Sequence, residues 1–485
     1  MEKIIHFETL GCRLNQDETE GAVRSFSKNG FSCHTEAVTS KTLTSEDVIF
    51  CVINTCTVTG KAEQKARRII RLCLEKFPKS IVCVTGCYAE LDEAAIKKID
   101  CNRITVIPGT KKFILNDVAF ELSKENLFTQ NGFVDIKKIN EFISEKNNYY
   151  SNVQISNLKF SLYTPVFEKH SRASLKIQDG CNNSCTFCRI HFARGKAISL
   201  NVEEVLKRVK ELELNGKEEV VLTGVNLSQY AGDFSENGKT EKKSFAFLLK
   251  YLVENTEKIK FRVSSFYPQC VTDELCEVLK NNRVQPFFHL SIQSGSNSVL
   301  KAMARPYTKN HVVDAVKKLN LARPEMFISC DIIAGFPGET ENDFNDTVSL
   351  CNECNFSWIH VFPFSARPGT SAASFKNQIE EKIKSYRAAV LGKIAVKGKI
   401  NYINSIVGKC FDAVVENSRA LRLRKNIEKD DEVKTYHAVT DNYIHVEFKS
   451  KELFENSRSV RLKIVRTLEE NIQTGKEIEA LAQIV

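Results

Sequence analysis

Three closely spaced cysteines constrain this chain more than any other feature of its sequence. Cys181, Cys185 and Cys188 form a C-x3-C-x2-C run that follows a short apolar segment, residues 175–178. Thiolates at this spacing can each bind one iron of an iron–sulfur cube and leave the fourth iron free for a substrate or cofactor. They also fit a zinc site that takes its fourth ligand from elsewhere, or a group of thiols that binds nothing. The spacing favours iron without excluding these alternatives.

The size and composition of the chain indicate a protein of several soluble domains. Its 485 residues exceed what a single hydrophobic core supports, so about two to four domains are expected. No apolar run approaches the roughly 20 residues that span a bilayer, and the first residues show no signal-peptide pattern, so we expect a cytoplasmic protein. The 17 cysteines fit a reducing compartment and metal binding better than disulfides. The net charge of +9 permits nucleic acid as a partner without requiring it.

Residues 1–112 alternate short β-rich runs with helical patterns, which predicts an open parallel sheet with crossover helices. Strands are expected at residues 4–10, 47–54 and 80–85, and helices at residues 17–29 and 61–77. Each predicted strand runs into a cysteine, namely Cys12, Cys56 or Cys87. Ligands of such sheets bind beyond the carboxyl ends of the strands, so these thiols are expected to converge in a second candidate cluster site. A cysteine-rich α/β domain also places some thiols near strand ends by chance.

The middle of the chain predicts a connector followed by a partial barrel. Residues 113–165 are rich in Asn and Lys and are expected to form an irregular connector with one helix at residues 135–144. Residues 166–400 repeat a β-then-α pattern, which predicts a partial (β/α)6 barrel with its functional rim at the carboxyl ends of the strands. The strands are expected at residues 175–178, 219–227, 260–266, 287–293, 327–334 and 357–364. The cysteine run follows the first of them, at that rim.

The C-terminal part predicts a different architecture. Short alternating runs over residues 401–470 indicate a small antiparallel β domain, with residues 471–485 as a C-terminal tail. Basic and acidic residues are equally numerous after residue 400, so binding of nucleic acid would need a local basic patch. Residues 419–425 are the candidate, and a solvated charged loop is the alternative.

Several predicted strand ends of the barrel carry glycine or polar residues around one rim. They lie at residues 222–226, 262–265, 289–295 and 331–339. Gly224 would let backbone groups approach a ligand closely because it has no side chain. A single such strand end is explained as a turn, but their recurrence around one rim indicates a binding site.

With these residues in view, the chain resembles a known family. The run from Cys181 to Cys188, with Phe187 before the last thiol, resembles the signature of the radical S-adenosylmethionine (SAM) superfamily, and residues 222–226 resemble its glycine-containing motif. Residues 176–195, 290–295, 331–340 and 362–370 are similar to the methylthiotransferases, as are the segments around Cys12, Cys56 and Cys87. The resemblance covers nearly the whole chain and leaves residues 113–165 unassigned.

The resemblance implies an N-terminal methylthiotransferase domain, a radical SAM core and a TRAM-type β-barrel associated with RNA binding. It implies two 4Fe–4S clusters, one on Cys181, Cys185 and Cys188 and one on Cys12, Cys56 and Cys87. The first would cleave SAM to a deoxyadenosyl radical that breaks a C–H bond, and the second would supply sulfur that is then methylated. No catalytic residue is assigned beyond the cluster ligands. The resemblance assigns cofactor contacts to Phe187, Thr223, Gly224, Asn226, Ser264, Gln293 and Asp331.

The sequence that flanks the central cysteines is most similar to one branch of this family. Residues 172–180 and 192–195 resemble the branch that acts on N6-threonylcarbamoyladenosine beside the anticodon. We therefore expect a tRNA methylthiotransferase that forms the 2-methylthio derivative of this nucleoside at position 37. The alternatives are methylthiolation of N6-isopentenyladenosine in tRNA or of a ribosomal protein, and, outside the enzymes, a metal-stabilised RNA-binding protein. The implied partners are tRNA and a flavodoxin- or ferredoxin-type electron donor, with no membrane, and a monomer is expected.

This chain differs from the usual sequence of the family at two places close to these motifs. Family members commonly have proline shortly after the third central cysteine, where this chain has Arg189, Ile190 and His191. His191 is expected to be a polar loop residue rather than a pH-sensitive or ligand-facing group. Ala366 replaces the proline of a more usual Ser-Pro-Arg sequence, which leaves Arg367 in place.

Overall fold

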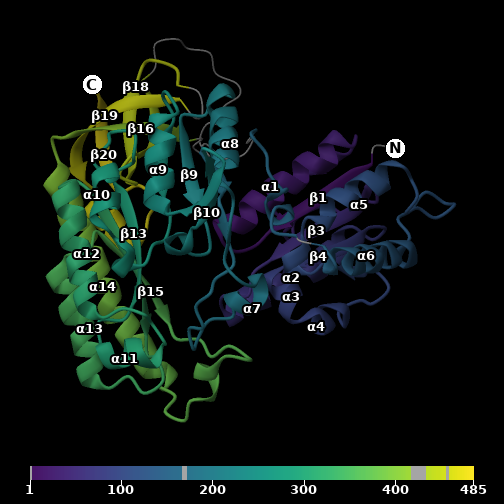
Figure 1. Ribbon diagram of the computed structural model, residues 1–485, viewed down its shortest axis with the longest axis horizontal. Coiled ribbons are helices and arrows are strands. Elements are labelled where there is room, and N and C mark those ends of the chain that lie inside the picture. The colour runs from purple at the N-terminus through teal and green to yellow at the C-terminus, as the bar shows by residue number, and fades with distance from the viewer. Residues whose placement is uncertain (1–2, 154, 167–171, 417–432, 455–457) are drawn as a thin grey trace.

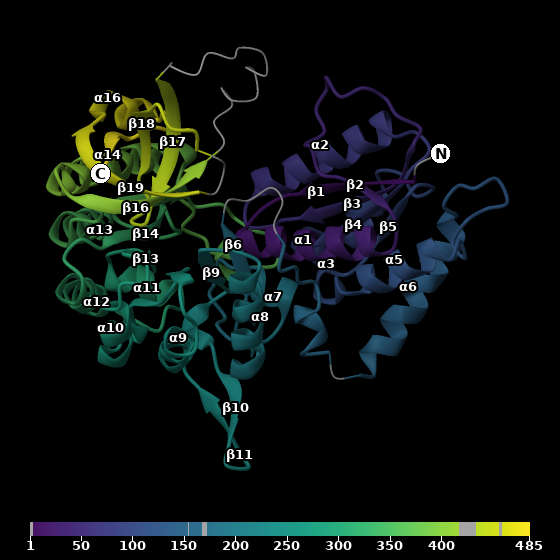
Figure 2. The ribbon, with the colours of Figure 1, turned by 90° about the horizontal axis from the view of Figure 1, so that it is seen from above.

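The computed structural model describes residues 3–153, 155–166, 172–416, 433–454 and 458–485. They form an N-terminal α/β domain, a central β/α core and a C-terminal β-barrel (Figure 1). In both overall views the N-terminal domain lies to one side of the core and the barrel (Figure 2). No helix in these ranges combines the length and the apolar character that crossing a membrane requires. The multidomain α/β class predicted from the sequence is confirmed.

The N-terminal domain contains a sheet of five parallel strands in the order β2-β1-β3-β4-β5. Helix α1 (Arg13–Lys28) packs on one face and α2 (Gly60–Lys76) on the other, so the central strands are buried along their whole length. From β1 the chain passes to β2 on one side, and the later strands β3, β4 and β5 are added on the other side. The position between β1 and β3 is therefore the switch point, where ligands of such sheets bind. The strands are β1 (Ile4–Thr9), β2 (Ser32–His34), β3 (Val48–Thr55), β4 (Ile81–Gly86) and β5 (Ile104–Val106).

The prediction of an irregular connector at residues 113–165 is wrong. This segment forms α5 (Ile114–Ser123) and α6 (Ile136–Ser151), which pack on the same face of the sheet as α1. Ile139 and Ile143 of α6 are buried one turn apart, whereas the Asn and Lys residues that suggested a linker lie mostly on the outer face of the helix. The single predicted helix is therefore longer than expected, and a second one precedes it.

The core is a partial (β/α)6 barrel, as predicted. Its six strands are parallel to their sheet neighbours and follow one another in chain order, as two three-stranded sheets that meet where Phe266 forms a bridge with Leu290. A projecting hairpin of β10 (Gly232–Glu236) and β11 (Lys239–Lys243) was not anticipated (Figure 2). The core strands are β6 (Ala173–Lys176), β9 (Glu219–Thr223), β12 (Lys260–Val263), β13 (Phe287–Gln293), β14 (Phe327–Ala334) and β15 (Trp358–Pro363). The helices that follow them include α8 (Val202–Leu214), α9 (Phe245–Glu254), α10 (Asp273–Leu279), α12 (Lys309–Ala322) and α13 (Glu341–Cys354).

The C-terminal strands form a closed barrel in the order β16-β17-β18-β20-β19. Two expectations are corrected. Residues 471–485 are not a separate tail, because α16 (Glu469–Thr474) ends within them and β20 (Ala480–Ile484) closes the barrel. The barrel is not wholly antiparallel, because β18 pairs with β20 in parallel. The basic patch predicted at residues 419–425 lies outside the described residues. The other strands are β16 (Cys410–Glu416), β17 (Lys434–Thr440), β18 (His445–Ser450) and β19 (Ser459–Thr467).

The barrel lies against the amino ends of the core strands, opposite the rim that carries the cysteine run. Lys260, the first residue of β12, forms a 2.5 Å ion pair with Asp412 of β16. Phe327, the first residue of β14, belongs to the hydrophobic core of the barrel. The long helix α14 (Glu381–Ile406) extends past the predicted boundary at residue 400 and contacts both β15 and β19. It therefore fixes the barrel to the core.

The packing of α14 predicts opposite effects for two of its glycines. A Cβ added at Gly398 would lie 2.2 Å from the carbonyl oxygen of Phe356, whereas a Cβ at Gly392 meets nothing within 4 Å. We expect Gly398→Ala to lower the free energy of unfolding by about 1–3 kcal/mol, because backbone must move to relieve the clash. Gly392→Ala should raise it by up to about 1 kcal/mol, because alanine has the higher helix propensity. Urea unfolding of both variants measures the difference, and a stabilising Gly398→Ala would contradict the close packing of α14.

Candidate functional site

Three cysteines of the N-terminal domain lie at the carboxyl ends of adjacent strands, as the sequence predicted. Cys12 is the N-cap of α1 directly after β1, Cys56 follows β3, and Cys87 is the first residue of α3 (Cys87–Leu91) after β4. A Cβ built on Gly11 would lie 2.9 Å from the Cys56 sulfur, so this thiol lies against the backbone next to Cys12. These three cysteines, the N-terminal trio, therefore surround the switch point of the sheet.

Burial disfavours free thiolates at Cys12 and Cys56. Burial raises the pKa of the Cys56 thiol to about 11. Cys12 keeps some exposed surface, yet desolvation of its thiol raises the pKa, and the nearby Arg194 guanidinium opposes this shift. None of the 17 cysteines forms a disulfide.

Asn15, in the first turn of α1, fixes two of the three cysteine-bearing loops. Its Nδ2 donates to the carbonyl of Leu10 at 2.8 Å and to the carbonyl of Thr55 at 3.1 Å. These carbonyls precede Cys12 and Cys56 closely in the chain, so one amide holds both loops in register. The Oδ1 of the same side chain accepts from Arg194 at 2.8 Å and from Lys112 at 3.0 Å.

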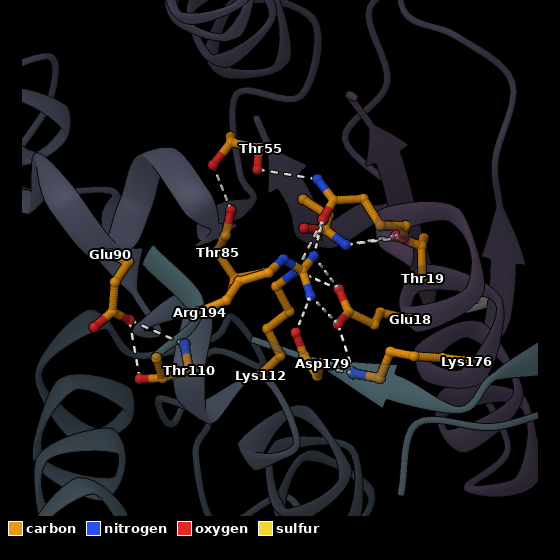
Figure 3. Close-up of polar contacts among 12 residues, drawn as sticks. Glu18, Thr19, Thr55, Thr85, Glu90, Thr110, Lys112, Lys176, Asp179 and Arg194 are labelled. Atoms are coloured by element: carbon orange, nitrogen blue, oxygen red, sulfur yellow. Dashed lines mark hydrogen bonds and ion pairs between the residues drawn. The ribbon is translucent and has the colours of Figure 1, made fainter. Parts of the chain in front are cut away.

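A buried cluster of charges joins this end of the N-terminal domain to the core (Figure 3). We call it the Glu18 cluster, and it comprises Glu18, Lys112, Lys176, Asp179 and Arg194. The Arg194 Nη1 donates to Glu18 at 2.9 Å and to Asp179 at 3.0 Å, and Lys176 donates to Glu18 at 2.8 Å. Lys112 donates to the other carboxylate oxygen of Glu18. All five side chains are buried.

The charges in the Glu18 cluster compensate one another. Burial alone would raise the pKa of the Glu18 carboxyl, but Arg194, Lys112 and Lys176 outweigh it and hold the pKa well below its usual value. The same balance lowers the pKa of Asp179 to about 2, through Lys176 and Arg194. Three cations face two carboxylates, so the cluster carries one excess positive charge beside the N-terminal trio, where Arg194 is electrostatically coupled to Cys87 and Cys12.

The second group of cysteines, the core trio of Cys181, Cys185 and Cys188, lies in a loop held at several points. The Cys181 amide donates to the Gly195 carbonyl at 3.0 Å, which closes the base of the loop. The Thr186 amide donates to the Met303 carbonyl at 3.2 Å. Cys185 is buried and the other two thiols are half-buried. Burial raises the pKa of the Cys188 thiol to about 11.

Arg305 is a half-buried cation beside the core trio that the sequence analysis missed. Its Nη1 donates to the Cys185 sulfur at 3.5 Å and to the Tyr267 hydroxyl. The guanidinium lies over the rings of Phe187, at 5.3 Å, and Tyr307, at 5.8 Å. The aromatic rings thus hold its guanidinium against the Cys185 sulfur.

Two predicted cofactor contacts carry polar atoms that are buried without a hydrogen-bond partner among the described residues. They are the Nδ2 of Asn226 and the Oγ of Ser264. The Asn226 amide itself donates to Gln178 Oε1 at 2.8 Å, and a Cβ on Gly224 would lie 2.8 Å from that same oxygen. The segment after β9 therefore packs closely against the base of the cysteine loop and leaves two polar groups free for a ligand.

The remaining predicted cofactor contacts differ in their burial and in the residues that they touch. Thr223 is buried at the end of β9, and Gln293 ends β13 with a φ of 74°. Phe187 packs edge-on against Phe336. Asp331 is paired with His289 at 3.1 Å, and nothing among the described contacts connects it with the cysteine loop.

Helix α7 (Ile190–Arg194) follows the core trio directly and reaches the N-terminal domain at both ends. Arg189, its N-cap, donates to Glu63 at 2.9 Å and to Asp92 at 3.1 Å. Arg367 also donates to Glu63, and Glu63 accepts from Thr57, the residue after Cys56, at 2.5 Å. We call these residues the Glu63 cluster. Arg194, at the other end of α7, belongs to the Glu18 cluster.

His191 lies on α7 and not in a loop, which corrects the sequence prediction. It is half-buried, and its Nδ1 is buried without a hydrogen-bond partner among the residues described. Burial lowers the pKa of the ring, which favours the neutral form.

The residues that sequence reasoning missed share one signal. Asn15, Glu18, Arg189 and Arg194 are polar residues that follow a trio cysteine within about two helical turns. Their partners in three dimensions could not be inferred, because most of them lie far away in the sequence; Glu18 and Arg194 are 176 residues apart. The structure thus connects both groups of cysteines, through residues next to them in the chain, to buried charged contacts between the N-terminal domain and the core.

Comparison with known proteins identifies relatives over most of the chain. Residues 175–351 match the profile of the radical SAM superfamily, and residues 4–107 match that of uncharacterized protein family UPF0004. A protein of Treponema pallidum (strain Nichols) named threonylcarbamoyladenosine tRNA methylthiotransferase MtaB is 41% identical over 463 residues, which cover 87% of this chain and 93% of that protein. A protein of the same name from Bacillus subtilis (strain 168) is 35% identical over 452 residues, or 92% and 91% of the two chains.

A further relative and one solved structure complete the comparison. A protein of Orientia tsutsugamushi (strain Boryong) named tRNA-2-methylthio-N(6)-dimethylallyladenosine synthase is 30% identical over 421 residues, or 84% of this chain and 86% of that protein. The structure of the radical S-adenosylmethionine methyltransferase TsrM from Kitasatospora setae, with cobalamin and a 4Fe–4S cluster bound, superposes with a TM-score of 0.52 at 12% identity and covers 77% of each chain. At this identity the likeness concerns the fold alone.

The burial of the Glu18 cluster predicts that its arginine matters more to stability than a surface arginine. Arg194→Met should lower the free energy of unfolding by about 3 kcal/mol or more, because it leaves buried carboxylates short of a partner. Arg461→Met is the matched control, since Arg461 pairs with Asp412 at 2.7 Å while half its side chain is exposed. It should cost about 1 kcal/mol or less. Urea unfolding of the metal-free protein measures both, and equal losses would contradict the buried cluster.

Asp17, next to the Glu18 cluster, predicts a dependence of stability on pH. Burial raises the pKa of this carboxyl to about 7, its Oδ1 accepts from the Ser174 hydroxyl, and its Oδ2 has no partner in the described ranges. Because the folded state holds this proton more tightly than the unfolded state, the carboxyl makes stability fall as pH rises from about 4 to 7.

Asp17→Asn keeps an acceptor for Ser174 but removes the titration. We subtract the free energy of unfolding of wild type from that of the variant at each pH. This difference should rise by about 2 kcal/mol or more between about pH 5 and pH 8. Unfolding curves at both pH values provide the test. A difference between variant and wild type that stays constant with pH would show that Asp17 does not titrate in this way.

Proposed function

The chain belongs to the radical SAM methylthiotransferase family, and we propose that it converts N6-threonylcarbamoyladenosine at position 37 of tRNA, next to the anticodon, into its 2-methylthio derivative. The observation that carries this proposal is the pair of cysteine trios joined by α7. A radical enzyme needs one cysteine trio to bind the cluster that cleaves SAM. A second trio is needed only if a second cluster supplies the sulfur atom. Both trios are fastened to the same short helix through the Glu18 and Glu63 clusters.

The radical SAM superfamily uses a 4Fe–4S cluster and SAM, and the core trio fits them. In the proposed holoenzyme Cys181, Cys185 and Cys188 would hold this cluster, and Cys12, Cys56 and Cys87 would hold a second one. When bound, these groups supply a carbon-centred radical that breaks an unactivated C–H bond, together with sulfur for the new C–S bond. The aromatic C–H at position 2 of the adenine offers no acidic proton and no leaving group, so radical chemistry is the appropriate route.

The residues around the core trio would bind and orient SAM. Gly224 allows the backbone after β9 to approach the ligand, and the unpartnered Asn226 Nδ2 and Ser264 Oγ would hydrogen-bond to its polar groups. Phe187 and Arg305 would cover the cysteine loop and exclude water from it. Thr223, Gln293 and Asp331 remain part of the proposed contact set.

The residues around the N-terminal trio would stabilise negative charge. Thiolates bound to iron and sulfide give a centre of net negative charge, and the excess cation of the Glu18 cluster lies beside it. Asn15 would hold the loops of Cys12 and Cys56 at the spacing that the centre requires.

The relatives support this substrate over the alternatives. The two relatives with 41% and 35% identity are named for threonylcarbamoyladenosine, and the relative named for dimethylallyladenosine is 30% identical. Action on isopentenyladenosine or on a ribosomal protein is therefore not favoured. An RNA-binding protein that uses metal only for stability would not need polar groups left free beside the core trio.

The proposal includes partners and a location. A flavodoxin- or ferredoxin-type protein would donate the electron, and the C-terminal barrel would act as a TRAM-type RNA-binding domain. The enzyme would work as a monomer in the cytoplasm, where tRNA and a reducing environment for its free thiols are present.

Replacing each trio separately tests this division of roles. Anaerobically reconstituted wild type should hold about eight irons per chain, and each triple Cys→Ala variant about four. Loss of the core trio should abolish cleavage of SAM to 5′-deoxyadenosine. Loss of the N-terminal trio should preserve that cleavage but abolish formation of the 2-methylthio nucleoside. Iron analysis and mass spectrometry of nucleosides measure these outcomes.

Cys101→Ala serves as the control, because this exposed cysteine belongs to neither trio. It should leave iron content and product unchanged. SAM cleavage that survives loss of the core trio would contradict the radical assignment. Deletion of the gene should remove 2-methylthio-N6-threonylcarbamoyladenosine from cellular tRNA, and loss of only the 2-methylthio isopentenyladenosine derivative would contradict the proposed substrate.

A further inference from the structure

A row of cations runs along the outer face of α2. Lys61, Lys65, Arg68 and Arg71 are exposed and spaced three or four residues apart, so they lie on one face of the helix. Together with Arg67 they line an open groove, whose other lining residues are Gln64, Leu72 and Glu75. No ion pair involves these four exposed side chains within the described part of the chain. We call them the α2 stripe.

The stability of α2 does not explain this arrangement. Lys61 and Lys65 lie in the N-terminal part of the helix, where positive charge opposes the helix dipole. Like charges three or four residues apart also repel one another by a few tenths of a kcal/mol for each pair. The pattern therefore lowers the stability of the isolated helix, which is the expected cost of a surface that binds an anion.

The position of the α2 stripe connects it with the proposed reaction centre. Its helix begins at Gly60, shortly after Cys56 of the N-terminal trio, and the N-cap Thr59 accepts from the Ala62 amide at 3.2 Å. A Cβ added at Gly60 would lie 3.1 Å from Arg367, which belongs to the Glu63 cluster. From there the stripe extends over about 15 Å between Lys61 and Arg71.

The C-terminal barrel lies away from the core trio. It packs at the amino ends of the core strands, whereas the core trio follows the carboxyl end of β6. The eight residues of β14 alone separate these ends by about 25 Å. A contact closer to the reacting base would therefore complement binding of the substrate by the barrel.

We propose that the α2 stripe binds the phosphate backbone of the tRNA arm that carries the target adenosine, an inference that rests on the proposed function. Backbone contacts set the position and register of a nucleic acid, and base contacts elsewhere select the nucleoside. The stripe would direct the anticodon arm so that the target base reaches the two trios.

An acidic protein such as the electron donor is the competing partner, and the chemistry of the groove favours RNA. Protein interfaces have a core of aromatic and apolar side chains. The described residues of α2 include no exposed large apolar side chain. Evenly spaced cations without such a core fit a repeating row of phosphates better than they fit a folded protein.

The test compares two triple variants of the reconstituted holoenzyme that change the net charge equally. The stripe variant carries Lys65→Gln, Arg68→Gln and Arg71→Gln. The control carries Lys382→Gln, Lys393→Gln and Lys397→Gln, which remove exposed cations of α14. Binding of a fluorescently labelled tRNA transcript is measured over a range of salt concentrations. We expect the stripe variant to lose about tenfold or more in affinity and to reduce the slope of log K against log salt by about 2, and the control to change neither appreciably.

The outcomes separate the proposed surface from the proposed function. Equal effects of the two variants, or unchanged tRNA binding by the stripe variant, would overturn the proposed tRNA contact. A stripe variant that keeps tRNA binding but no longer binds a flavodoxin would also overturn it. Unchanged iron content and SAM cleavage in the stripe variant show that its fold and core trio are intact. If the stripe variant alone loses tRNA while wild type forms no 2-methylthio product, the surface stands and the proposed function fails.

Discussion

The buried carboxylate of Glu18 is the interaction on which the functional centre of this protein depends. It accepts from Lys112 of its own domain and from Lys176 and Arg194 of the core. A buried ion pair contributes little net stability compared with apolar packing, but it is costly to leave incomplete. The N-terminal domain is therefore held in one orientation on the core, because other orientations would leave these charges without partners. A reaction shared between two trios requires a fixed orientation of the N-terminal domain on the core more than it requires added stability.

The topology of each domain places its trio so that this contact can join them. The switch point of the doubly wound sheet gathers Cys12, Cys56 and Cys87, and the first βα loop of the partial barrel carries the core trio. Both arrangements use the carboxyl ends of parallel strands, where backbone and side chains are free to bind ligands. Helix α7 then connects the two, since Arg189 and Arg194 at its ends contact Glu63 and Glu18.

Periodicity and the position of cysteines predicted the parts of this structure that depend on local sequence. They predicted the three kinds of folded unit and the six core strands, and they placed Cys12, Cys56 and Cys87 at strand ends. Composition misled at residues 113–165, because the exposed face of α6 is rich in Asn and Lys while buried Ile139 and Ile143 determine its packing. The closing strand β20 was missed because two of its five residues are alanine, which has a low strand propensity. The charged clusters were missed because most of their partners are distant in sequence, and only the nearness of four of their residues to cysteines hinted at them.

Arg189 and Arg194, at the two ends of α7, are the residues that we expect to fix the distance between the two trios. Pulsed EPR of the reduced holoenzyme can measure the magnetic coupling between the two proposed clusters. We expect a well-defined coupling in wild type and in Arg461→Met, and a weaker or broadened coupling in the double variant Arg189→Met and Arg194→Met at unchanged iron content. The same coupling in all three proteins would contradict this role of the two arginines.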